Sequence, residues 1–135
     1  MINAVNVPVQ TVAVNSNVLF QSTRIRTGCS ARHEQGSGRF VALKPGVYQV
    51  TYGGNVSIPT DGTVAPIILD LLQDGEAIAG GRVIVTPTVV DAPATFSRTV
   101  LVKVFCDCCV SLSVRNSGTT EINVQDASFV ITREC

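Results

Sequence analysis

The fold is decided by the stretch Val110-Ser111-Leu112-Ser113-Val114-Arg115, in which apolar and polar side chains alternate strictly. A period of two places the two sets of side chains on opposite faces of an extended chain, so this stretch predicts a half-buried β-strand. In residues 121–133 the alternation returns, but its phase slips between Val124 and Ala127. The slip predicts a β-bulge near Gln125–Asp126.

Strand signals continue outward from this stretch toward the N-terminus. Runs rich in β-branched residues predict further strands in Val47–Ile58, Ala65–Leu72, Val83–Val85 and Thr95–Cys106. Turn residues occur at Lys44-Pro45-Gly46, Asp61-Gly62, Asp74-Gly75, Gly80-Gly81 and Asn116-Ser117-Gly118. No ten-residue window has the spacing of an amphipathic helix. We therefore predict an all-β antiparallel sandwich of the jelly-roll type.

The composition indicates one globular domain with a net charge of zero. The chain has 135 residues, of which 45% are hydrophobic and 15% are charged, and ten basic residues balance ten acidic ones. Nucleic-acid binding needs a concentrated positive field, which is missing here, so we predict no nucleic-acid partner. No run approaches the roughly 20 apolar residues of a membrane helix, so we predict no membrane partner. Low net charge favours association.

The first fifteen residues allow two interpretations. Apolar residues interleaved with Asn, Gln, Thr and Pro make this segment extended and strand-capable, and Pro8 suggests an edge position. Residues 1–15 are therefore either the first strand of the domain, whose remainder is 16–135, or an arm that adds a strand to a neighbouring molecule. The residues that would carry the arm are Ile2, Val5, Val7 and Val9.

The expected strand Thr95–Cys106 has apolar residues on both faces. Phe96 lies in one phase, and Leu101 and Phe105 lie in the other. We expect one face to meet the core and the other a partner, which makes Phe96, Leu101 and Phe105 interface candidates.

Three segments together resemble a known family. Phe40–Tyr52 contains Gly-Val-Tyr after a turn, Leu69–Ile78 contains a strand–Asp-Gly–strand unit, and Val110–Ile131 covers the last two strands. Over residues 18–134 this pattern resembles C1q/TNF-like jelly rolls. The similarity is greatest to leaderless bacterial members found on spore surfaces and in prophage-like clusters.

The resemblance implies a non-enzymatic domain that forms homotrimers. Such domains act as fibre heads, coat components or receptor binders, and this chain lacks the Gly-X-Y repeat of collagen-tailed members. We therefore expect any stalk or anchor to belong to another protein, or no stalk to exist. The N-terminus shows no Sec signal peptide, so the protein either stays in the cytosol or leaves when the producing cell lyses. We expect the second route, which leads to a spore surface or virion.

Five cysteines are the densest chemical feature of the chain. They are Cys29, Cys106, Cys108, Cys109 and Cys135. Their spacing suits a metal site poorly, and His33 is the single imidazole, so we expect no metal and no cofactor. We expect disulfides to form after release, with Cys29 paired to Cys108 or Cys109 and one sulfur left over.

Catalytic chemistry has little support. Cys29 and His33 are conceivable as a nucleophile pair, but the polar, Gly-rich segment Ser30–Gly38 is expected to be an exposed loop with no third orienting residue. Asp70 and Asp74 flank a hairpin and are interpreted as turn residues. We predict that the protein is not an enzyme and has no catalytic residues.

A group of arginines has two open interpretations. Arg24, Arg26, Arg32 and Arg39 lie close in sequence to Glu34. They form either a solvated surface or a patch for a ligand or partner.

Together these observations predict a self-assembling structural subunit of an extracellular surface or fibre, of the spore appendage or coat type. Its partner would be itself, and disulfides would lock the assembly. The alternatives are a phage fibre or capsid-decoration domain and a receptor- or glycan-binding trimeric head. The low aromatic content of 5% makes the glycan alternative the weakest of the three.

Overall fold

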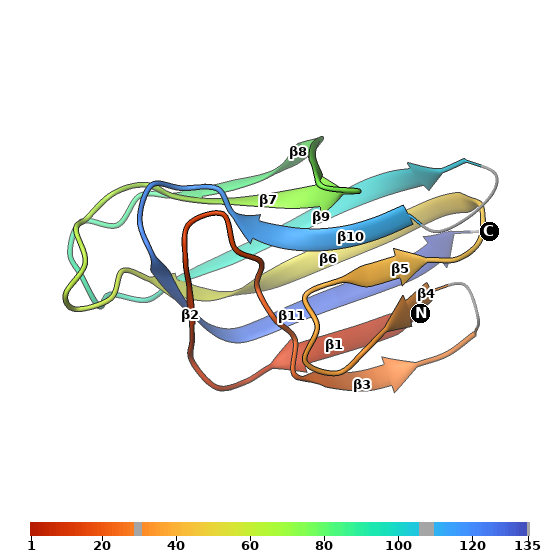
Figure 1. The fold of residues 1–135 in the computed structure, drawn as a ribbon, viewed down its shortest axis with the longest axis horizontal. Coiled ribbons are helices and arrows are strands. Elements are labelled where there is room, and N and C mark those ends of the chain that lie inside the picture. The colour runs from red at the N-terminus through yellow and green to blue at the C-terminus, as the bar shows by residue number, and fades with distance from the viewer. Residues whose placement is uncertain (29–30, 106–109, 135) are drawn as a thin grey trace.

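The computed structural model describes residues 1–28, 31–105 and 110–134. Within these ranges eleven strands form two antiparallel sheets that pack face to face (Figure 1). In the first sheet the order is β3 (Ser22–Arg26), β1 (Ile2–Asn6), β11 (Ile122–Glu134), β6 (Gly46–Ser57) and β9 (Ala94–Val104), and β2 (Gln10–Val12) also pairs with β11. In the second sheet the order is β4 (Ala31–His33), β5 (Phe40–Ala42), β10 (Val110–Asn116), β7 (Ile67–Gln73) and β8 (Glu76–Val85). The predicted all-β sandwich is confirmed.

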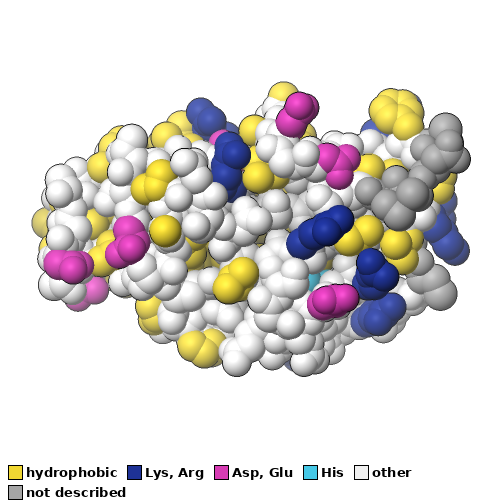
Figure 2. Space-filling model, in the orientation of Figure 1, with side chains coloured by type: hydrophobic (Ala, Val, Ile, Leu, Met, Phe, Trp, Pro, Cys, Tyr) yellow, Lys and Arg dark blue, Asp and Glu magenta, His cyan; other side chains and the backbone are white. Residues whose placement is uncertain are grey.

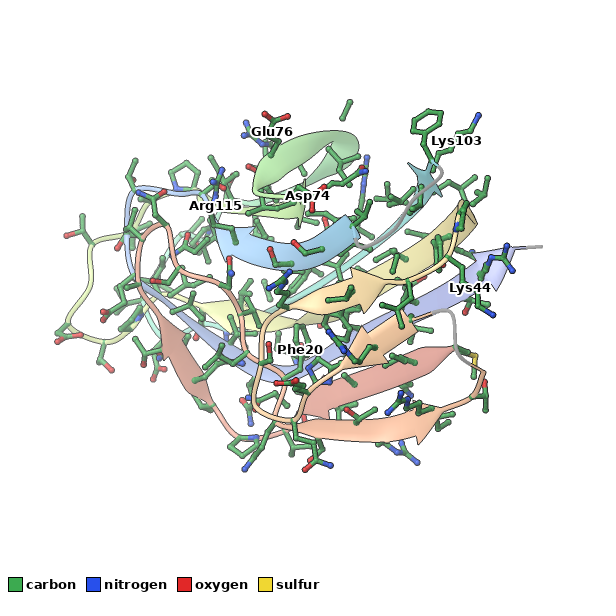
Figure 3. All side chains as sticks on the ribbon, turned by 45° about the vertical axis from the view of Figure 1, so that its right-hand side comes forward. Phe20, Lys44, Asp74, Glu76, Lys103 and Arg115 are labelled. Atoms are coloured by element: carbon green, nitrogen blue, oxygen red, sulfur yellow. The ribbon has the colours of Figure 1, made fainter. Side chains whose placement is uncertain are left out.

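The core lies between the sheets and has an aromatic centre. The rings of Phe40 in β5 and Phe129 in β11 stack with centroids 3.9 Å apart, and Phe20 meets both rings edge-on. Figure 3 shows Phe20 in the middle of the sandwich. Tyr52 in β6 extends the cluster from the first sheet. Aromatic pairs in such geometry contribute beyond their buried area, so this cluster ties the two sheets together.

The alternation at the C-terminus has the predicted effect. Leu112 and Val114 are buried in β10, and β11 changes register between Gln125 and Ser128. Asp126 has a positive φ of 52° at this point, so the predicted bulge is confirmed. Gly54 lies opposite in β6, where an added Cβ would come within 3.0 Å of the Ala127 backbone.

Of the predicted turns Asp74-Gly75 and Gly80-Gly81, only the first is a turn. Asp74 and Gly75 have positive φ values of 53° and 87° and close the β7–β8 hairpin as predicted. Gly80-Gly81 is not a turn, contrary to the prediction. Both residues lie inside β8, where its register against β7 shifts opposite Asp70 to Leu72. Glycine suits such an irregularity because backbone or neighbouring side chains can approach closely, and an added Cβ at Gly81 would lie 3.1 Å from Leu71 Cβ.

The N-terminal segment belongs to the sheet of its own domain. β1 pairs with β3 on one side and with β11 on the other, and the side chain of Ile2 is fully buried. Ile2 is therefore a core residue and was wrongly assigned to an assembly arm. A strand with neighbours on both sides has no free edge to give to another molecule. Val7 and Val9 follow β1 and are exposed.

Candidate functional site

The outer face of the first sheet is built from uncharged side chains. The strand registers align three rows across β1, β11, β6 and β9: Asn3–Val130–Thr51–Thr99, Val5–Ser128–Gly53–Ser97 and, without β1, Thr132–Gln49–Leu101. We call these eleven residues the neutral face. Their neighbours along each strand, such as Phe129 and Val50, point into the core and are buried. The neutral face follows from the pleat, because the positions between core residues carry Ser, Thr, Val, Asn, Gln, Gly or Leu.

Charged residues occur only around the neutral face. Lys103, labelled in Figure 3, pairs with Val47 in the next row and lies at the end of β9. Arg24 and Arg26 lie on the edge strand β3. Within the face the hydroxyl groups of Thr51 and Thr99 are 3.1 Å apart and hydrogen-bond to each other. An uncharged centre with a charged rim is the arrangement found in protein–protein interfaces.

One edge of the first sheet also exposes large apolar side chains. Leu101 is 64% exposed and Phe105, just beyond β9, is 70% exposed, with the Lys103 ammonium 5.1 Å from the Phe105 ring centroid. Phe96 is not part of this surface. It is only 7% exposed and packs near Tyr52, because it shares the inward face with Val100, Val102 and Val104. Its assignment as an interface candidate was wrong.

The outer face of the second sheet is charged (Figure 2). Asp70 in β7 is 2% exposed, and its carboxylate accepts two hydrogen bonds from Arg82, from Nε at 2.8 Å and from a terminal nitrogen at 3.0 Å. These bonds, more than the opposing effect of burial, hold the pKa of Asp70 below its usual value. The sequence suggested that Asp70 is a turn residue. The structure shows instead that it is a strand residue in an ion pair. Asp74 does belong to the turn, and its Oδ1 accepts a hydrogen bond from the Ser111 backbone at 2.9 Å.

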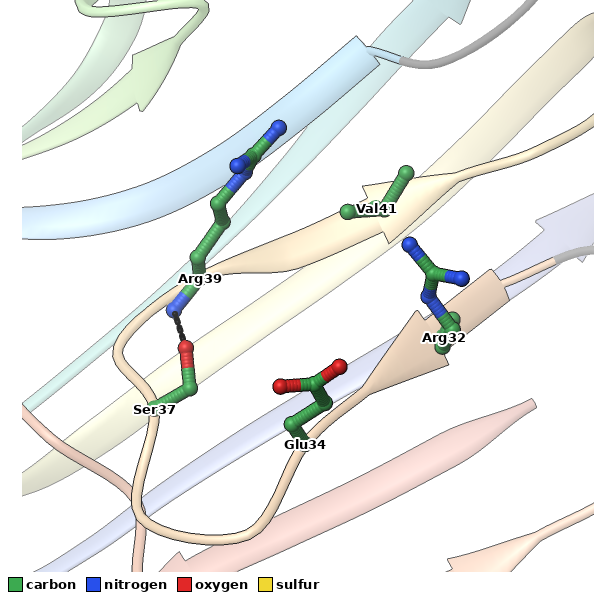
Figure 4. A pocket seen from close by; sticks show the side chains of 5 residues that line it. All are labelled: Arg32, Glu34, Ser37, Arg39 and Val41. Carbon is green, nitrogen blue, oxygen red and sulfur yellow. Dashed lines mark hydrogen bonds between the residues drawn. The ribbon is translucent and has the colours of Figure 1, made fainter.

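Two of the four grouped arginines line one shallow pocket on this charged face. Arg32 in β4 and Arg39 before β5 flank Val41, and Glu34 and Ser37 complete the lining (Figure 4). The backbone N–H of Arg39 donates to Ser37 Oγ at 3.0 Å and orders the loop below the pocket. Arg24 and Arg26 lie on β3 in the other sheet and do not line the pocket.

His33 has a structural position. It lies in β4, is 6% exposed and stacks on Phe40 with ring centroids 4.3 Å apart. Its Nδ1 lies 2.7 Å from Thr23 Oγ1 and its Nε2 lies 2.8 Å from the Ser37 carbonyl oxygen. In the neutral ring that fits these partners, Nε2–H donates to Ser37 and Nδ1 accepts from Thr23. Burial lowers the pKa of His33, which favours this neutral form.

The expectation of an exposed loop over Ser30–Gly38 is therefore wrong for Ala31–His33, which form β4. The polar, Gly-rich composition was misleading because His33 is buried by stacking on Phe40 and by hydrogen bonds to Thr23 and to Ser37 of the same segment. Both ring nitrogens of His33 already have hydrogen-bond partners. The bond with Thr23 joins β4 to β3, so the role that the geometry shows for His33 is to connect these two strands. The other member of the conceivable pair, Cys29, lies outside the described residues.

All five cysteines lie outside the described residues, so the disulfide pairing stays a prediction. Over the ranges that the structure covers, no group of His, Cys, Asp and Glu side chains could hold a metal ion. The same ranges contain no helix of sufficient length and apolarity to cross a membrane.

Comparison with known proteins identifies the fold of this chain. No family model and no curated protein sequence matches the chain. Among solved structures, the globular domain of zebrafish complement 1qA protein superimposes with a TM-score of 0.62 at 12% identity, covering 98% of each chain. The chain has a C1q/TNF-like fold.

Two further structures support the same C1q/TNF-like sandwich. Murine APRIL matches with a TM-score of 0.57 at 12% identity over 91% of this chain and 96% of its own. Rabbit GITRL matches with a TM-score of 0.50 at 17% identity over 76% of each chain. The resemblance inferred from residues 18–134 is thus confirmed at the level of the fold.

Proposed function

We propose that this chain is a non-enzymatic structural subunit that assembles into a homotrimer through the neutral face. The observation that carries the proposal is the contrast between the two outer faces of the sandwich. Three rows of the first sheet contain no charged residue, whereas the second sheet carries Arg32, Arg39, Asp70 and Arg82 on its outer side. Charge is depleted at the centre of interfaces, so the first sheet is the assembly side.

Apolar burial would add to this assembly. Leu101 is an exposed member of the neutral face, and Phe105 is exposed beside it. Burying each against a neighbour would contribute roughly 1.5–3 kcal/mol before the ordering costs of association. C1q/TNF-like domains usually form compact homotrimers, and the fold therefore supports a closed trimer as the unit.

Disulfides would then lock the assembly at one end. β3, β11 and β9 run in the same direction, because each is separated from the next by one antiparallel strand. All five cysteines follow these three strands in the sequence: Cys29 follows β3, the group at 106–109 follows β9, and Cys135 follows β11. We propose that Cys29 pairs with Cys108 or Cys109 within the domain, and Cys135 is our candidate for a bond between subunits.

The biological setting that we propose is an extracellular surface, namely a spore coat or appendage reached after lysis of the producing cell. A fibre or decoration protein of a phage would use the same trimer, and the identity of neighbouring genes separates the two settings. Growth of a filament by donation of the N-terminal strand is not part of the proposal, since β1 is held between β3 and β11.

The test compares one substitution on each outer face. Val130 lies at the centre of the neutral face, and Ile84 in β8 is 60% exposed on the other sheet. Light scattering of the wild type should give about three times the 14.2 kDa chain mass. Val130→Glu should give a folded monomer, because it places three charges at the centre of the trimer, whereas Ile84→Glu should stay trimeric.

Circular dichroism of both variants shows that they are folded before their masses are compared. A wild type that remains monomeric at micromolar concentration rejects the trimer. A Val130→Glu protein that remains trimeric while folded rejects the neutral face as its interface.

A further inference from the structure

The pocket between β4 and β5 lies on the outer side of the second sheet, away from the neutral face. It has a volume of about 160 Å³ and is open to solvent on one side (Figure 4). Arg32 and Val41 are directly paired across the two strands, and the side chain of Val41 is only 8% exposed. Val41 thus provides an apolar floor, while Arg32 and Arg39 stand on either side of it. This position stays accessible whether the chain is a monomer or the proposed trimer.

Within the described part of the chain, both guanidinium groups of the pocket lack a partner. Among the described residues, neither the Arg32 nor the Arg39 side chain makes a hydrogen bond or ion pair. Other arginines differ, because their guanidinium nitrogens already have partners. Arg82 binds Asp70, Arg115 binds Ser117, and Arg133 binds the Pro45 carbonyl. Two unpaired cations in one pocket repel each other, and an anion between them would relieve that repulsion.

The residue types indicate which anion fits. A guanidinium group offers paired N–H donors that match the two oxygens of a carboxylate. Glu34 lines the same pocket and adds a negative charge, which disfavours a doubly charged phosphate. A carboxylate side chain accepts hydrogen bonds and donates none when ionised, so it suits a hydroxyl group next to the bound anion.

From this arrangement we infer that Arg32, Arg39 and Glu34 form a binding site for a sugar acid, a carboxylate with neighbouring hydroxyl groups. The carboxylate lies between the two arginines, a hydroxyl donates to Glu34, and the sugar ring covers Val41. The same chemistry occurs in uronic acid residues of a polysaccharide and in a free sugar acid.

The experiment titrates the full-length protein with glucuronate, glucose and inorganic phosphate, followed by amide chemical shifts of Arg32, Arg39 and Val41. Glucuronate should bind in preference to both other probes, because glucose lacks the carboxylate and phosphate lacks the hydroxyl groups. Arg32→Gln and Arg39→Gln should each weaken glucuronate binding by at least about tenfold, the effect of one charged hydrogen-bonding group.

Two variants make the result specific. Arg24→Gln removes an exposed arginine of the other sheet and should leave binding unchanged. Glu34→Gln should strengthen phosphate binding, since it removes the negative charge from the rim. The inference is overturned if glucuronate causes no shifts at these three residues, if phosphate binds as well as glucuronate, or if Arg24→Gln weakens binding as much as Arg32→Gln.

A last comparison identifies the source of the sugar acid. A glucuronate-containing oligosaccharide that binds much more tightly than the monosaccharide indicates a polysaccharide, because linked sugars can occupy several sites at once. Equal affinity indicates a free sugar acid.

Discussion

The hydroxyl group of Tyr52 in β6 donates a hydrogen bond to the backbone carbonyl of Gly81 in β8, and so joins one sheet to the other. The neighbouring carbonyl of Gly80 accepts a second bond from Arg98 Nε at 2.8 Å. Both carbonyls lie where β8 loses its register with β7. Side chains of the first sheet thus satisfy backbone groups of an irregular strand in the second, and the buried carbonyl of Gly81 requires such a partner.

Removing this hydroxyl group should destabilise the sandwich. In Tyr52→Phe the buried Gly81 carbonyl loses its partner, so we expect the free energy of unfolding to fall by about 1–3 kcal/mol. Urea denaturation followed by circular dichroism measures the change. An unchanged midpoint would show that the bond contributes nothing to stability.

The same residue predicts how stability responds to alkaline pH. Burial raises the pKa of Tyr52 to about 12, above the value of about 10 in an unfolded chain. The folded state therefore favours the protonated form, and its contribution is complete below about pH 10 and is lost as the pH rises toward 12. Comparing unfolding at about pH 9 and about pH 11 should show a larger loss for the wild type than for Tyr52→Phe. Equal losses in the two proteins would contradict this assignment.

Asp70 predicts the opposite response, at acid pH. Its hydrogen bonds from Arg82 lower its pKa, so its contribution to stability is complete above the unfolded value of about 3.9 and is lost as the pH falls through the folded value. Asp70→Asn should lower the melting temperature near pH 7 and should approach the wild type in strongly acid solution. Glu76→Gln, an exposed residue beside the same hairpin, is the control and should melt like the wild type near pH 7.

His33 provides a second acid-sensitive group. Burial lowers its pKa below the unfolded value of about 6.5, so the unfolded chain binds the proton more readily. Stability from His33 is therefore complete above about pH 6.5 and declines as the pH falls through the folded value. His33→Gln removes this titration, and the difference in unfolding free energy between wild type and variant should shrink on going from about pH 7.5 to about pH 5. A difference that stays constant over this interval would show that His33 does not titrate there.

Local sequence patterns predicted the strands and several turns because those features depend on neighbouring residues. The alternation at Val110–Arg115 and the phase slip at Gln125–Asp126 each describe one strand and its pleat, and the Asp74-Gly75 turn needs only its own φ angles. The candidate interface was found in part, since Leu101 and Phe105 stood out as apolar residues on the second face of a strand.

Features that depend on distant residues escaped the sequence. Asp70 is buried because Arg82 lies opposite in β8. His33 is buried because its ring packs against Phe20 and Phe40 and accepts a hydrogen bond from Thr23 of the other sheet. The alternation of residues 2–6 is the same for a strand in its own sheet and for one given to a neighbour, so it could not decide between them. The neutral face also appears only when the register places Val130, Thr51 and Thr99 side by side.

The pairing of β1 with β11 has a consequence for how the chain folds. Ile2 lies opposite Ile131, so the first strand finds one of its two neighbours only after almost all of the 135 residues have been made. Until then a growing chain exposes an apolar strand with an open side, and closing so long a loop is slow because its entropy cost comes before the contacts form. We therefore expect the first sheet to close only after β11 has been synthesised, with β1 protected from other chains in the meantime.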